Sequence, residues 1–65
     1  MAVVPDIDLP SLVGKPIEVA RATVVAAGGV TRTVEPGGVL TADFQANRVT
    51  LVVQDGHVVD IPVLG

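Results

Sequence analysis

The side chains in this 65-residue chain that could take part in catalysis are few and widely separated. The single histidine, His57, follows a predicted turn glycine, and the single serine, Ser11, lies near the opposite end of the chain. A Ser-His-Asp site needs these groups gathered in a pocket that excludes water, and so short a chain has little material to enclose one. A histidine in a turn is most often solvated. We therefore expect that the protein is not an enzyme.

Carboxylates and metal ligands give no stronger signal. Asp6 with Asp8, and Asp43 with Asp55, could be imagined as acid and base pairs, but all four lie in predicted arm, loop or turn positions where solvation is the commoner role. A metal site needs ligands clustered at a defined spacing, and one histidine with scattered carboxylates and no cysteine does not provide them. We expect neither a metal nor a cofactor.

Charge and composition exclude further classes of function. The net charge is −3, and the four basic residues are spread singly, so no basic patch is available for nucleic acid. No apolar run approaches the length of about 18 residues that a membrane span requires. The N-terminus lacks the cationic start and long apolar stretch of a signal peptide. We expect a soluble monomer, with secretion and cytoplasmic residence both left open.

The patterning predicts one helix and three strands. In "GKPIEVARATVVAAGG" the apolar positions 17, 20, 24 and 27 form one stripe, Pro16 suits the first turn, and Gly28-Gly29 is a stop signal. Residues 30–35, 48–54 and 57–63 read as strands, with Asp55-Gly56 as a hairpin turn between the last two. The predicted fold class is α+β, a single helix packed on a small mixed sheet.

Two segments lie outside these elements. Residues 1–10, with two prolines and two aspartates, are expected to form an N-terminal arm, which leaves 11–65 as the domain. The apolar residues of the stretch "GGVLTADFQANRV", residues 37–49, have no helical or strand period that would bury one face. A long loop in a small domain is either a disordered excursion or a binding element, because function concentrates on loops held by a rigid scaffold.

Motifs along most of the chain resemble a known family. "SLVGKPIEVARATV", "PGGVLTADFQANRVTLVV" and the closing "IPVLG" are similar to the potato inhibitor I family of serine-protease inhibitors, which includes barley chymotrypsin inhibitor and leech eglin. "TVEPGGVLTADFQANRVTLVV" also looks like a microbial elastase-inhibitor family of the same fold. The resemblance implies a serine protease inhibitor, free of disulfides, with a long exposed reactive-site loop that binds the enzyme as a substrate would.

The resemblance also implies the roles of particular residues. The reactive bond would lie between Ala42 and Asp43, with Ala42 in the primary specificity pocket. The remaining loop residues expected to contact the protease are Val39, Leu40, Thr41 and Phe44. Arg48 aligns with an arginine that braces the loop in such inhibitors. Because Ala42 is small, the expected partners are subtilisin-like and elastase-like proteases.

The chain departs from the family pattern at positions that matter for the brace. Thr50 stands where relatives usually have a second bracing arginine, and Gln45 stands where they often have another. These departures predict a looser loop than in the best-known relatives. A PASTA-like module that binds or spaces bacterial cell walls is the alternative function, since "RVTLVV" and the helix region also resemble that module. The residues "TADFQANR" and the C-terminal hairpin are unexplained by it.

Overall fold

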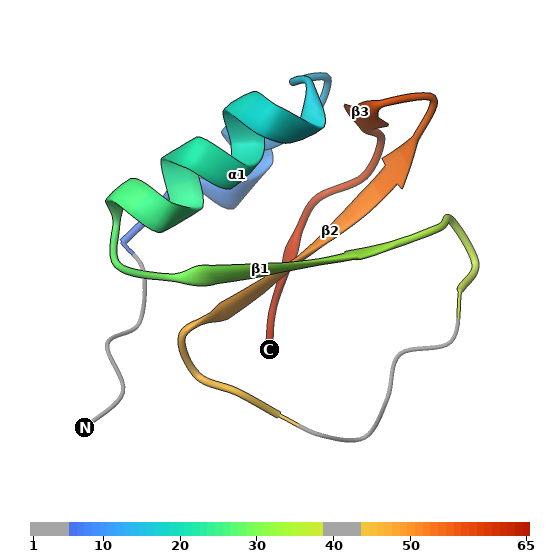
Figure 1. The fold of residues 1–65 in the computed structure, drawn as a ribbon. Coiled ribbons are helices and arrows are strands. Elements are labelled where there is room, and N and C mark those ends of the chain that lie inside the picture. The colour runs from blue at the N-terminus through green and yellow to red at the C-terminus, as the bar shows by residue number, and fades with distance from the viewer. Residues whose placement is uncertain (1–5, 39–43) are drawn as a thin grey trace.

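The computed structural model describes residues 6–38 and 44–65. In chain order the elements are the 3-10 helix η1 (Leu9–Leu12), α1 (Ile17–Ala26), β1 (Val30–Val34), β2 (Arg48–Gln54), β3 (His57–Val58) and β4 (Val63–Leu64). The helix covers one face of a small sheet, while the chain leaving β1 and the chain entering β2 run away from the helix (Figure 1). The predicted α+β class, with one helix on a mixed sheet, is confirmed.

The ends of α1 follow from local sequence. Pro16 precedes the first helical residue, where a missing N–H costs nothing, and Glu18 lies in the first turn at the positive end of the helix. At the other end the Gly29 N–H donates to Val24 O and the Gly28 N–H to Val25 O, which is a Schellman motif. Gly28 has φ of 88°, a conformation that favours glycine. The predicted stop at the glycine pair is confirmed.

The sheet is built around β2. β1 pairs with it in parallel, with Val30 opposite Arg48 and Val34 opposite Val52, and β3 and β4 pair with it in antiparallel fashion. Two parallel neighbours cannot be joined by a tight turn, because the chain must return along the whole strand before pairing again. The long connection between β1 and β2, residues 35–47, is therefore required by the topology itself.

The predicted third strand, residues 57–63, is wrong as a single element. Asp55 and Gly56 both have positive φ, as the predicted hairpin turn requires, but pairing ends at Val58 and resumes at Val63. Val58 pairs with Val53 and Val63 pairs with Thr50, so the four residues 59–62 span only two residues of β2 and the register of pairing shifts by two. Pro62 has no N–H to donate, and the Asp60 carboxylate accepts from the Ile61 N–H at 2.8 Å, so both residues favour leaving the ladder.

The core lies between α1 and the facing side of the sheet. Its buried members come from η1, α1, β2 and β3 and are Leu12, Ala20, Val24, Val49, Leu51 and Val58. Ile7 and Leu9, which fall within the segment expected to be an arm, pack against this cluster. Odd-numbered residues of β2 point toward the helix, so Arg48, Thr50 and Val52 lie on the opposite face.

Candidate functional site: the ends of the β1–β2 connection

The connection between β1 and β2 is anchored by a turn at each end of residues 39–43. On the first side the Gly38 N–H donates to Glu35 O at 2.9 Å, with Pro36 and Gly37 at the two central positions. Gly37 has φ of 75°, so this is the geometry of a type II turn. On the second side the Arg48 N–H donates to Gln45 O at 3.0 Å. The described flanks of the connection are therefore ordered by hydrogen bonds.

Most residues of the predicted reactive-site loop lie outside the described part of the chain. Val39, Leu40, Thr41, Ala42 and Asp43 all belong to this group. Phe44 is the described member, and its side chain is 71% exposed. Its ring lies against Gly65, since a Cβ added to that glycine would come within 2.9 Å of Phe44 Cδ2. An exposed aromatic ring at the end of a loop is available to a partner.

Arg48, predicted to brace the loop, is partly buried at the first position of β2. Its Nη2 donates to the main-chain oxygen of Gly65 at 3.3 Å, and its own carbonyl accepts from the Gly65 N–H at 2.7 Å. Gly65 therefore lies between the Phe44 ring and the Arg48 side chain. Its φ of 124° and the nearness of Phe44 both favour glycine here. These contacts tie the second end of the connection to the strand next to it.

Arg32 is a member of the same cluster that the sequence analysis did not single out. From the middle of β1 its Nε donates to Thr50 Oγ1 at 3.2 Å, and its Nη2 donates to the same Gly65 oxygen at 3.1 Å. Strand register is the feature that identifies Arg32, because Arg32 pairs directly with Thr50 in the parallel ladder and lies on the same face of the sheet. Strand register cannot be read from local pattern, so the side chain looked like an isolated surface charge.

The two positions where the sequence departs from the resembling family have different surroundings. Thr50 is fully buried, and its hydroxyl accepts the hydrogen bond from Arg32. Gln45 is exposed, and its amide donates to Asn47 Oδ1 at 2.8 Å, within the turn that leads into β2. Thr50, where the family usually has a bracing arginine, therefore contacts the guanidinium of Arg32 from the neighbouring strand β1.

The remaining candidates for chemistry are not brought together. His57 is exposed in the hairpin with Nδ1 3.0 Å from Asp55 O, and the Ser11 hydroxyl donates to Asp8 O next to η1. Among the described residues no group of three or more histidine, cysteine, aspartate and glutamate side chains could hold a metal ion. Across residues 6–38 and 44–65, α1 and the other helical segment are too short to cross a membrane.

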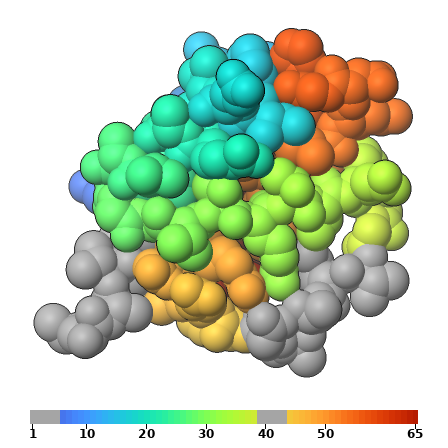
Figure 2. Space-filling model, in the orientation of Figure 1, coloured from blue at the N-terminus to red at the C-terminus, as the bar shows by residue number. Residues whose placement is uncertain are grey.

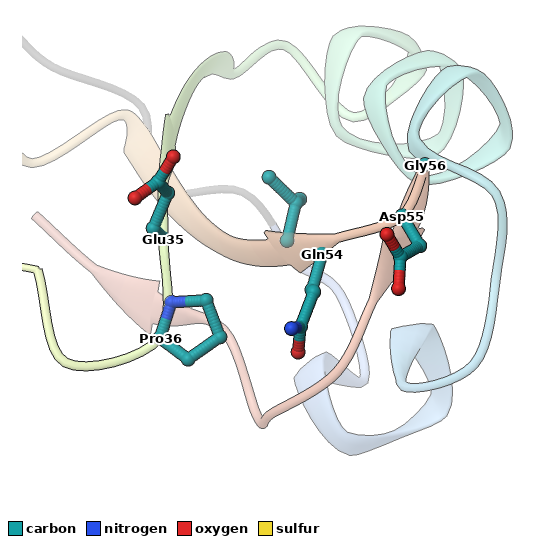
Figure 3. Close-up of a pocket in the computed structure, with 6 residues that line it drawn as sticks. Glu35, Pro36, Gln54, Asp55 and Gly56 are labelled. Atoms are coloured by element: carbon teal, nitrogen blue, oxygen red, sulfur yellow. The ribbon is translucent and has the colours of Figure 1, made fainter.

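A shallow hollow lies at the far end of β2, away from these arginines. Its lining comprises Glu35, Pro36, Val53, Gln54, Asp55 and Gly56. Glu35 and Asp55 stand on opposite sides of it and do not point toward one another (Figure 3). Such an open hollow with separated carboxylates lacks the enclosure of a ligand pocket. The surface of residues 44–48 lies at the lower edge of the molecule, below β1 (Figure 2).

The described residues form a small sheet with one helix and a long connection whose two flanks end in hydrogen-bonded turns. Residues 6–62 match the model of the peptidase inhibitor I78 family, so the chain belongs to this family. The crystal structure of bitter gourd trypsin inhibitor is similar over 100% of both chains, with a TM-score of 0.81 and 25% sequence identity. A comparison with curated proteins gave no match.

These findings confirm the expected class. The protein is a member of a protease inhibitor family, which points to a non-catalytic role and to proteases as partners. The matching family model is I78 and not potato inhibitor I, so the expected protease inhibitor class is confirmed, while the specific assignment to potato inhibitor I is not.

Proposed function

We propose that this protein inhibits subtilisin-like and elastase-like serine proteases by presenting residues 39–44 as a substrate-like loop. The reactive bond is Ala42–Asp43, and Ala42 occupies the primary specificity pocket. The motifs shared with the potato inhibitor I family suggest the same mode of binding. The complex is one inhibitor with one protease, with no cofactor.

The observation that carries this proposal is the anchoring of both ends of the loop. The turn at Glu35–Gly38 and the turn at Gln45–Arg48 fix the described flanks of the connection by hydrogen bonds. Arg48 and Gly65 hold the second end against the sheet. A loop that is already restricted loses less conformational entropy on binding, which raises affinity without adding contacts. An extended loop can then pair with the enzyme as an added strand.

The size of Ala42 sets the expected specificity. A methyl group fills a small primary pocket but leaves a deep, aromatic-accepting pocket nearly empty, at about 0.8 kcal/mol of lost burial for each missing methylene. Trypsin needs a cation in its primary pocket. The similar bitter gourd protein is named as a trypsin inhibitor, but Ala42 supplies no cation, so we do not extend trypsin inhibition to this chain.

An active-site titration panel tests the proposal. Purified protein is incubated with subtilisin, elastase, chymotrypsin and trypsin of known active-site concentration, and residual activity is followed as inhibitor is added. We expect stoichiometric inhibition of subtilisin and elastase, weak inhibition of chymotrypsin and none of trypsin. Tighter inhibition of trypsin than of subtilisin would contradict the assignment of Ala42. Inhibition of none of the four would leave the inhibitor proposal without support and favour a binding module of another kind.

A further inference from the structure

We infer that Arg32 is a positioning residue for the reactive-site loop, supplying from β1 the second guanidinium that β2 lacks at Thr50. The inference rests on the proposed function and deepens it. It concerns a residue that neither the sequence motifs nor the family match points to. Its basis is the hydrogen bonding around Gly65 on the sheet face away from α1.

The first step is the placement of Arg32 by strand register. β1 and β2 are parallel, and Arg32 is the direct partner of Thr50. Side chains of directly paired residues in neighbouring strands project from the same face. The guanidinium of Arg32 therefore crosses the strand boundary to reach β2, where Nε donates to Thr50 Oγ1 at 3.2 Å.

The second step is the use of both ends of the guanidinium plane. Nε is fixed on Thr50, and Nη2 donates to the Gly65 oxygen at 3.1 Å. A planar group held at two points has little freedom left, which is the property that distinguishes arginine from lysine as a brace. Arg48 Nη2 donates to the same oxygen at 3.3 Å. Two arginines from two strands thus converge on one main-chain atom.

The third step leads from that atom to the loop. Gly65 also donates its N–H to Arg48 O at 2.7 Å and lies against the ring of Phe44. Phe44 directly follows Asp43, the residue after the proposed reactive bond. Arg32 therefore acts on the loop through Gly65 and Phe44, at the end of the connection that leads into β2.

The fourth step concerns why position 50 is threonine. Thr50 is fully buried beneath this cluster. An arginine there would project from the same face of the sheet and would compete with the Arg32 guanidinium for the same space and the same acceptor. In the resembling family an arginine at position 50 of β2 places its guanidinium on this face. Here threonine occupies position 50, and Arg32 places its guanidinium there from the neighbouring strand β1. The loop need not be looser for lacking an arginine at position 50.

The expected consequence is resistance to net cleavage. Hydrolysis of the Ala42–Asp43 amide consumes one water and leaves a carboxyl group on Ala42 and an amino group on Asp43, and resynthesis releases that water. During hydrolysis the Ala42 carbonyl is first held as an ester of the protease's serine, with the Asp43 amino group as the leaving group. If the Phe44 side stays fixed, this amino group remains close to the ester at high effective concentration, attacks its carbonyl, releases the serine hydroxyl and re-forms the amide. Loss of Arg32 should let this end move, so cleavage should become faster and the equilibrium should shift toward the cut form.

The experiment compares wild type, Arg32→Ala and Arg32→Lys in incubations with catalytic subtilisin. Mass spectrometry follows the cut fraction to equilibrium, and thermal melting reports on the fold. We expect Arg32→Ala to be hydrolysed roughly tenfold to a hundredfold faster, the range set by loss of charge-assisted hydrogen bonds. Arg32→Lys should fall between, because an ammonium group keeps the charge but cannot hold both acceptors in one plane. The equilibrium ratio of intact to cut protein should drop in the same order.

Four further variants separate the effect of positioning from the effects of charge and stability. Arg21→Ala removes an exposed arginine on α1, so it matches the charge change and should behave as wild type. Val24→Ala destabilises the core and should lower the melting temperature with little change in the ratio of intact to cut protein at temperatures where it is folded. Arg32→Thr combined with Thr50→Arg moves the guanidinium to β2 and should restore slow hydrolysis. Thr50→Arg alone should not improve on wild type.

The outcomes are distinguishable. Failure of wild type to inhibit subtilisin counts against the proposed function itself. Inhibition by wild type with Arg32→Ala and Arg32→Lys both hydrolysed at the wild-type rate would overturn the role of Arg32 alone. If Arg32→Ala does not fold, Arg32→Lys and the double variant Arg32→Thr with Thr50→Arg test the inference. Restored resistance to hydrolysis in the double variant supports it. A folded double variant that is hydrolysed rapidly overturns it.

Discussion

At the scale of single residues, Ala42 and Arg48 have separable expected roles. Ala42→Leu or Ala42→Phe enlarges the side chain offered to the primary pocket, and each added buried methylene contributes about 0.8 kcal/mol. We therefore expect at least tenfold tighter inhibition of chymotrypsin by either variant. Inhibition constants measured for subtilisin and chymotrypsin side by side check the shift, with urea unfolding as the control on the fold. Equal affinity of Ala42→Phe and wild type for chymotrypsin would show that a loop residue other than Ala42 occupies the primary pocket.

Arg48→Ala tests the predicted brace directly. It removes a charge-assisted hydrogen bond to Gly65, and such bonds contribute roughly 1.5–3 kcal/mol. The side chain lies on the sheet face away from the core, so affinity for subtilisin should fall more than the free energy of unfolding does. Inhibition constants and urea denaturation of the same sample check this. A larger loss of stability than of affinity would show that Arg48 mainly stabilises the fold. Hydrolysis of Arg48→Ala by subtilisin at the wild-type rate would show that Arg48 does not brace the loop.

At the scale of elements, the turn before the loop is the sharpest test of anchoring. Gly37→Ala places a Cβ at φ of 75°, where an L-residue is strained by about 1–2 kcal/mol. We expect weaker inhibition together with a small loss of stability. Gly37→Asn is the matched variant, because asparagine tolerates this conformation better, and it should retain most of the inhibition. Inhibition constants for the pair check the turn, and equal values would show that it does not hold the loop.

The same scale shows how far sequence reasoning reaches. Local signals predicted α1, β1, β2 and the Asp55-Gly56 hairpin, because caps, glycines and side-chain alternation act over a few residues. The break at residues 59–62 was missed because Val59 and Ile61 keep strand-like composition, although pairing ends at Val58 and resumes only after Pro62. The loop and Arg48 came from resemblance. Arg32 could not be found either way, since its partner lies 18 residues away along the chain and is defined by register alone.

At the scale of the whole molecule, stability rests on a core small enough for one residue to matter. A domain of this size has about 3–10 kcal/mol of stability by the per-residue rule. Val24 is fully buried and Val25, its neighbour on α1, is 57% exposed, so the two form a matched pair. Val24→Ala should lose roughly 1.5–3.5 kcal/mol from burial and the cavity it leaves, and Val25→Ala well under 1 kcal/mol. Urea denaturation checks both values. Equal losses of stability in the two variants would show that Val24 is not a core residue.

The parallel pairing of β1 with β2 has a consequence for any protein cut between Gly38 and Phe44. The connection at 35–47 is the covalent link between the part that holds α1 and β1 and the part that holds β2, β3 and β4 (Figure 1). A nicked molecule is therefore a two-chain heterodimer held by a strand ladder and a shared core. Its dissociation follows mass action, so dilution should separate the halves and mixing should reassemble them. The two halves would then behave as the fragments of a split protein, with their junction at the proposed reactive-site loop.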